Sequence, residues 1–230
     1  MSEPTRTITE GQGMTPTGGM VSRQEAIRAA DAVICQIMEH CERIEIAGSI
    51  RRGRELVHDA DMVVIPKGKV EVKVEVEGGR SGDGRGAARV RIRQVMRELH
   101  VGAANEFRAG EKMVSAVVRV PSDWTRGTEE AQWAEVQVDV YFATQENFGM
   151  ILCVRTGSAN HNIWMAQTCK TMGMKFAAGS GIIQNSETRD QNAELPRGRT
   201  EEEVFGALGL MAPEPELREI ACGTPLWMKR

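Results

Sequence analysis

The chain has 230 residues, a formal net charge of -3 and 41% hydrophobic residues, which fits one or two small globular domains. No apolar run approaches the ~18 residues needed to cross a bilayer, and the N-terminus lacks the apolar stretch of a secretion signal. The five cysteines are scattered without Cys-x-x-Cys spacing, which argues against structural zinc and for a reducing, intracellular location such as cytoplasm or nucleoid. Because the chain is not basic overall, any contact with nucleic acid must come from a local patch.

The first part of the chain predicts a mobile tail followed by a sheet unit. Residues 1–21 are rich in Gly, Thr and Pro and show no period, which is typical of a mobile tail. Ser22 and Glu25 have the spacing of a helix capping box, and apolar residues follow at helical intervals. The pattern then predicts strands at 44–47, 59–65 and 69–77, a helix at 87–100, and an antiparallel pair of strands at 113–120 and 135–142.

The pattern changes after residue 145, and we expect a second unit at 146–230. Helices are predicted at 148–154 and 163–172, with a short hairpin at 176–184. Thr200 and Glu203 have the spacing of a second capping box. The whole chain is therefore predicted to be α+β, with a mixed, mainly antiparallel sheet and flanking helices, then a small C-terminal α/β subdomain.

Three aspartates in the predicted strands are the strongest functional signal. Asp59 and Asp61 stand two residues apart, so their side chains point to the same face of a strand. Asp139, in another predicted strand, can join them. Three clustered carboxylates repel one another and cannot all stay ionised without cations, and hard divalent ions such as Mg²⁺ are the usual answer. Two such ions about 4 Å apart would clamp the attacking and leaving oxygens of a phosphoryl transfer.

A glycine-serine turn lies shortly before the first two aspartates, in the stretch Gly48-Ser49-Ile50-Arg51-Arg52. Backbone N–H groups at such a turn, where a helix opens, can bind an anion. Arg52 can donate paired hydrogen bonds to phosphate oxygens. We expect Arg51 to face solvent.

This arrangement of a Gly-Ser turn and an Asp-x-Asp strand resembles the nucleotidyltransferase core of the DNA polymerase X family, the polymerase-beta-like enzymes. The strand bearing Asp139, the turn Thr156-Gly157-Ser158 and the C-terminal segment that starts at Thr200 fit in order. The resemblance implies a nucleotidyltransferase palm at 22–145 and, at 146–230, a thumb-like subdomain that grips nucleotide and template.

The resemblance also implies an activity and its cofactor. The expected reaction is the metal-dependent addition of nucleotides to a nucleic-acid 3' end, as in a small DNA-repair polymerase, with in-line attack on the α-phosphate and release of pyrophosphate. Asp59, Asp61 and Asp139 would hold two Mg²⁺ ions, for which Mn²⁺ can substitute. The implied partners are a nucleoside triphosphate and a DNA primer and template, with RNA as an alternative, and no membrane.

The nucleotide-binding residues are also carried over from the resemblance. Gly48, Ser49 and Arg52 would hold the terminal phosphates, while Gly157 and Asn162 would face the sugar and base. Arg89 and Arg93, in the arginine-rich predicted helix, would track a nucleic-acid backbone, and a solvated helix face is the equal alternative.

The sequence departs from the family pattern at several places. Val154 and Arg155 stand where relatives often have an aromatic pair near the sugar, so we expect ribonucleotides to be well tolerated. Gln137 stands where relatives often have arginine. No segment before residue 22 has the pattern of a lyase or helix-hairpin-helix domain, so we expect a minimal core, for which an accessory protein is one candidate means of holding DNA.

Two alternatives stay open. One is a template-independent nucleotidyltransferase that acts on RNA, protein or a small-molecule acceptor. The other is a nucleic-acid-binding module without activity.

Overall fold

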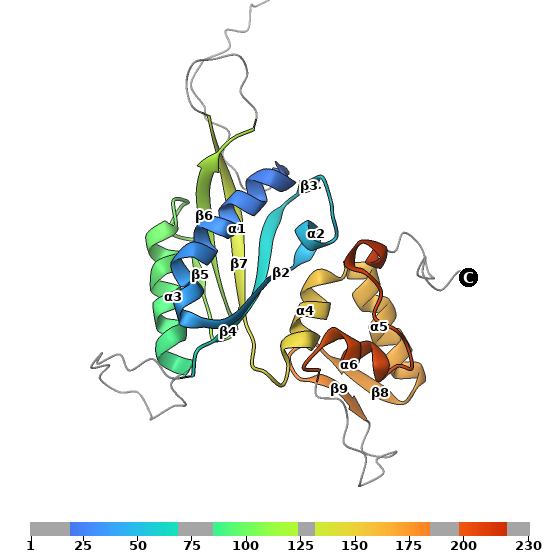
Figure 1. The fold of residues 1–230 in the computed structure, drawn as a ribbon. Coiled ribbons are helices and arrows are strands. Elements are labelled where there is room, and N and C mark those ends of the chain that lie inside the picture. The colour runs from blue at the N-terminus through green and yellow to red at the C-terminus, as the bar shows by residue number, and fades with distance from the viewer. Residues whose placement is uncertain (1–18, 69–84, 124–131, 185–197, 220–230) are drawn as a thin grey trace, which may run out of the picture.

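The computed structural model describes residues 19–68, 85–123, 132–184 and 198–219 (Figure 1). Most of the predicted tail and the predicted strand at 69–77 lie outside these described residues. None of the helices within the described ranges is long and apolar enough to span a membrane.

A five-stranded sheet in the order β2-β4-β7-β6-β5 forms the centre of the first half of the chain. Its strands are β2 (Cys41–Ile46), β4 (Asp59–Pro66), β5 (Arg108–Ala109), β6 (Met113–Pro121) and β7 (Trp133–Phe142). β4 and β7 run parallel, and the other neighbouring pairs are antiparallel. The predicted mixed, mainly antiparallel sheet is therefore confirmed, as is the antiparallel pairing of β6 with β7.

Two long helices, α1 (Arg23–Ile37) and α3 (Arg85–Leu99), cover one face of this sheet (Figure 1). Side chains of alternating strand residues, such as Met62 and Val64 in β4 and Val138 in β7, are fully buried against these helices. This period of two forces the residues between them, including the aspartates, onto the opposite face. The predicted capping box starts α1, since Ser22 and Glu25 bond reciprocally.

Short elements connect and extend the sheet. They are the 3-10 turn η1 (Met38–His40), the short helix α2 (Gly48–Arg51) and a two-stranded ribbon of β1 (Val21–Ser22) and β3 (Leu56–Val57). The helix α2 connects β2 with β3 and contacts β4.

The second half of the chain forms its own small core. Its elements are α4 (Phe148–Thr156), α5 (Ala159–Thr171), the hairpin of β8 (Met174–Ala177) and β9 (Gly181–Gln184), α6 (Glu201–Gly206) and η2 (Pro215–Arg218). α5 starts four residues before the predicted helix because the Ser158 hydroxyl caps it by accepting from the His161 N–H. The second capping box is half formed: Thr200 accepts from the Glu203 N–H, but the Glu203 carboxylate accepts from Arg199.

Helix α4 connects the two halves by packing on the aspartate-bearing face of the sheet. Its Phe148 and Leu152 lie in one apolar cluster with Val63 of β4 and Tyr141 of β7. This places the turn after α4 beside the aspartates. The exact division of the chain at residue 145 stays a prediction.

Candidate active site

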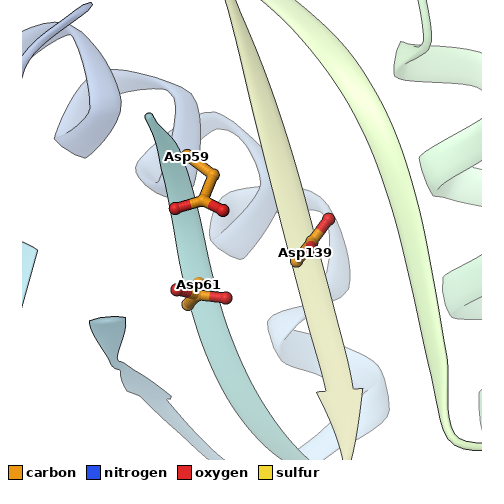
Figure 2. Close-up of side chains that lie close together, drawn as sticks. All are labelled: Asp59, Asp61 and Asp139. Carbon is orange, nitrogen blue, oxygen red and sulfur yellow. The ribbon is translucent and has the colours of Figure 1, made fainter. Parts of the chain in front are cut away.

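The three aspartates meet where β4 and β7 run side by side. Asp61 pairs with Asp139 in the strand register, and Asp59 lies opposite Gln137. One carboxylate oxygen from each aspartate lies within 4.8 Å of the others, and Figure 2 shows the three side chains on the two neighbouring strands. The sequence prediction that a third strand carboxylate joins Asp59 and Asp61 in space agrees with this geometry.

The cluster holds more negative charge than its surroundings favour. Burial, followed by the charges of Asp59 and Asp139, raises the pKa of Asp61 to about 7. Burial and Asp139 also raise the pKa of Asp59. A compact, oxygen-only donor set that includes the two carboxylates with raised pKa, Asp59 and Asp61, fits a hard divalent cation such as Mg²⁺.

The Asp139 carboxylate is oriented by its neighbours along β7. Gln137 Nε2 donates to Asp139 Oδ1 at 3.1 Å, and the Tyr141 hydroxyl donates to Oδ2 at 3.1 Å. All three residues share a strand face, because they are spaced by two. Gln137 thus stabilises Asp139 by a neutral hydrogen bond rather than by a positive charge.

Gly48 is required by the close approach of its backbone to the cluster. Its φ is 62°, in the left-handed region that favours glycine. A Cβ atom built on Gly48 would also overlap Asp61 Oδ2. The Gly-Ser turn therefore lies directly against the carboxylate that is most strongly perturbed.

A pocket of about 550 Å³ opens over the aspartates and is lined by residues from both halves of the chain. Six predicted site residues line it: Ser49, Arg52, Asp59, Asp61, Gly157 and Asn162. Gly48 and Asp139 do not line the pocket, but Gly48 lies against Asp61 and Asp139 belongs to the three-aspartate cluster. The structure thus brings together the predicted metal-ligating and nucleotide-binding residues.

Arg52 is held at the wall of this pocket by two contacts. Its Nε donates to Glu219 Oε1 at 2.6 Å and its Nη1 donates to the Thr156 carbonyl at 2.6 Å. These bonds fix the guanidinium between α2 and the turn after α4. An arginine fixed in this way is pre-organised for an anion in the pocket.

The predicted sugar- and base-facing residues lie at the start of α5. A Cβ atom on Gly157 would overlap His161 Nδ1, so only glycine lets the turn pass so closely. Asn162 Nδ2 donates to the Val154 carbonyl at 2.8 Å, while its Oδ1 has no partner within the described residues. His161 is fully buried, and burial lowers its pKa to about 4, so it packs as a neutral ring.

The expectation that Arg51 faces solvent is wrong. Its guanidinium donates to both oxygens of Glu201, at 2.9 and 2.7 Å, and to Thr156 Oγ1 at 2.8 Å. Arg218 binds the same carboxylate from the other side. Arg51 faces inward because Glu201, 150 residues away in sequence, lies buried between the two halves. We call Arg51, Glu201 and Arg218 the interdomain ion network.

Sequence reasoning assigned no site role to Tyr141 and treated Arg155 only as a departure. The Arg155 guanidinium lies 3.8 Å from the centre of the Tyr141 ring. Arg155 also favours the ionised form of Asp61 and so opposes the rise of its pKa. The strand spacing of two could have predicted Tyr141, but no local pattern indicates that Arg155 reaches the cluster.

The two arginines predicted to track nucleic acid do not line the pocket over the aspartates. Arg93 donates to the Gly110 carbonyl at 2.6 Å. Arg89 lines a different cavity. Both guanidinium groups lie over the Phe142 ring, at 5.7 Å for Arg89 and 5.3 Å for Arg93.

Comparisons with known proteins agree with the geometry. Residues 151–219 match the family model described as DNA polymerase beta thumb. The chain is also 26% identical over 180 residues, 78% of its length, to the DNA polymerase/3'-5' exonuclease PolX of Bacillus subtilis (strain 168). The match covers 25% of that relative, so the chain spans about a quarter of its length.

Proposed function

We propose that this chain, which is DNA polymerase X-like, is a metal-dependent nucleotidyltransferase that extends the 3' end of a nucleic acid, most simply a DNA primer. The observation that carries the proposal is the three-carboxylate cluster at the base of a pocket that also presents Ser49 and Arg52. A cation-binding cluster beside an anion-binding wall is the arrangement that transfer of a nucleotidyl group requires.

The position of each residue in the pocket suggests its role in the proposed reaction. Asp59, Asp61 and Asp139 would hold two Mg²⁺ ions, which supply Lewis-acid activation of the attacking hydroxyl and stabilise the charge on the leaving pyrophosphate. Ser49 and Arg52 orient the terminal phosphates at the wall of the pocket. Gly157 leaves room for the sugar, and Asn162 Oδ1 is an acceptor at the start of α5. Catalysis then consists mainly of positioning and charge stabilisation.

The test is nucleotide incorporation by the variant Asp139→Ala. We expect a loss of incorporation of at least about 10²-fold, because one metal ligand is removed. Asp31→Ala is the matched control, since Asp31 is exposed on α1, and it should extend primers like the wild type. Asp139→Ala protein that still extends a primer with Mg²⁺ or Mn²⁺ would show the assignment to be wrong.

A second candidate keeps this chemistry and changes the acceptor to RNA. Val154 and Arg155 line the proposed catalytic pocket over the aspartates and bear on the sugar of the incoming nucleotide, so they leave the acceptor open to experiment. A panel of gapped DNA, single-stranded DNA and RNA ends separates the two candidates. Clear preference for a gapped DNA template would exclude the second, and extension of RNA ends alone would exclude the first.

A further inference from the structure

A second cavity of about 350 Å³ lies next to the catalytic pocket and has no role in the proposed reaction. Arg89 at the start of α3, Lys112 before β6, Phe142 at the end of β7 and Gly179 in the β8-β9 turn contribute to its lining. Tyr141 and Arg155 line both this cavity and the catalytic pocket. The two spaces are therefore neighbours separated by those two side chains.

The charges around the second cavity do not balance. Three cations, Arg89, Lys112 and Arg155, line it together with one carboxylate, Glu111. Arg89 Nε is buried and has no hydrogen-bond partner in the part of the chain that the structure describes. Buried polar groups nearly always have partners, so the described residues do not fully satisfy the Arg89 side chain that lines this cavity.

Like charges are crowded at the same place. Burial, and then the charge of Arg89, lowers the pKa of the neighbouring Arg93. An anion in the cavity would relieve this repulsion, whereas the exposed Glu111 is one charge against several.

The aromatic rings hold the cations in place. Arg155 stacks on Tyr141 and Arg89 lies over Phe142. Stacking on a ring limits the orientations of a guanidinium and leaves its edge free for hydrogen bonds, the geometry that suits phosphate. Ala178 and Gly179, which close the cavity from the β8-β9 turn, are small and leave the space open.

We propose that the second cavity binds a phosphate group through Arg89 and Lys112, with Arg155 shared between it and the catalytic pocket. The phosphate belongs either to a free anion such as pyrophosphate or to a nucleic-acid strand that passes the catalytic pocket. The cavity volume is at the small end for ligand sites, which fits one or two phosphate groups. Arg89, which the sequence predicted to contact nucleic acid, would then bind phosphate in this cavity.

The test compares Arg89→Glu with Arg91→Glu, which change the net charge equally. Arg91 is exposed on the same helix and bonds to Gln94, so it controls for the overall field. Pyrophosphate binding is measured by titration calorimetry, and binding of a fluorescein-labelled single-stranded oligonucleotide by anisotropy, both in EDTA. We expect about tenfold weaker binding of at least one probe for Arg89→Glu relative to Arg91→Glu.

The two probes identify the source of the phosphate. Loss of pyrophosphate binding indicates a free anion, while loss confined to the oligonucleotide, with a salt slope reduced by about 1, indicates a strand. Because Arg89 also packs on Phe142, Lys112→Glu on an exposed lysine is a second variant with the same expected loss. Equal binding of both probes by these variants and Arg91→Glu would overturn the proposal.

The outcome is independent of catalysis. The Asp139→Ala protein should bind pyrophosphate in the second cavity as the wild type does, because that residue does not line it. If Asp139→Ala still extends primers while Arg89→Glu loses phosphate binding, the proposed function fails and the second site stands.

Discussion

Two carboxylates withdrawn from solvent, the half-buried Asp61 of the aspartate cluster and the buried Glu201 of the interdomain ion network, have pKa values shifted in opposite directions. Burial alone would raise the pKa of both. Around Asp61 two further carboxylates add to that rise, whereas around Glu201 hydrogen bonds from Arg51 and Arg218 outweigh it and lower the pKa. Glu201 is therefore satisfied by the protein itself, while Asp61 is left to be satisfied by a cation from outside.

The interdomain ion network holds the fold together, whereas the aspartate cluster leaves charge for a ligand to satisfy. The interdomain ion network ties α2 to α6 and η2 with complete hydrogen bonding. The aspartate cluster lowers the stability of the fold by placing like charges together, and such strain persists only where the surrounding structure is firm. Packing of α4 on β4 and β7 supplies that firmness.

The largest expected effect comes from removing the charge of Glu201. Glu201→Gln leaves Arg51 and Arg218 without a counter-ion, and Arg218 is only 1% exposed, so we expect about 3–5 kcal/mol of destabilisation. Urea unfolding followed by circular dichroism measures it. The neighbouring Glu202→Gln, on an exposed side chain, should change the free energy of unfolding by less than about 0.5 kcal/mol. A Glu201→Gln protein as stable as this control would show that the network contributes nothing.

Neutralising Asp61 is expected to stabilise the metal-free protein, whereas neutralising Glu201 destabilises it. Because its folded pKa is raised to about 7 from 3.8, the metal-free protein should lose stability as the pH rises from about 4 through 7. Asp61→Asn removes this dependence and should stabilise the metal-free protein at pH 8 by about 1–3 kcal/mol. Melting in EDTA from pH 5 to 8 measures both proteins.

The Glu201 carboxylate supplies the internal control for that pH series. Its lowered pKa means that the stability it contributes is present above its unfolded pKa and is lost as the pH falls below about 4.5. The two effects therefore occupy different pH ranges. A metal-free wild-type protein whose stability is flat between pH 5 and 8 would contradict the interpretation of Asp61.

The aspartate cluster was predictable from sequence, and the interdomain ion network was not. Strand alternation places Asp59 and Asp61 on one face, and this follows from local geometry alone. The partner of Arg51 is Glu201, far away in the chain, and no local pattern connects them. The helical propensity around Arg51 indicates a helix start, but whether its side chain faces water depends on where α6 docks.

The contrast between local patterns and contacts with distant residues also explains which helix boundaries were predicted correctly. Apolar content predicted α1, α3 and α4 well: α1 and α3 each bury one periodic face, and α4 is apolar and buried along most of its length. The start of α5 was predicted too late because its first turn is defined by the Ser158 cap and not by apolar residues. The second cavity was beyond sequence reasoning altogether, because its lining comes from α3, β7, α4 and the β8-β9 turn.

The smallest expected effect concerns Arg155, which belongs neither to the aspartate cluster nor to the interdomain ion network. Its positive charge acts on Asp61, and its side chain also lines the pocket where the sugar of a nucleotide would lie. With Val154 and Arg155 in place of two aromatic rings, positions 154 and 155 present no rigid ring to the sugar, so a 2'-hydroxyl should meet little steric resistance. We expect wild-type incorporation of ribonucleotides within about tenfold of deoxyribonucleotides, a difference near 1.4 kcal/mol.

Arg155→Tyr tests whether the side chain at this position sets the sugar preference. A rigid ring there should raise the preference for deoxyribonucleotides, while Arg155→Lys, which keeps the charge and flexibility, should leave the ratio near that of the wild type. Single-nucleotide incorporation with both sugars, expressed as a ratio of kcat/KM, cancels any shared loss from disturbing Asp61. If Arg155→Lys and Arg155→Tyr change the ratio equally, loss of the guanidinium that stacks on Tyr141 explains the change. Arg155 then acts by supporting the carboxylates and does not select the sugar.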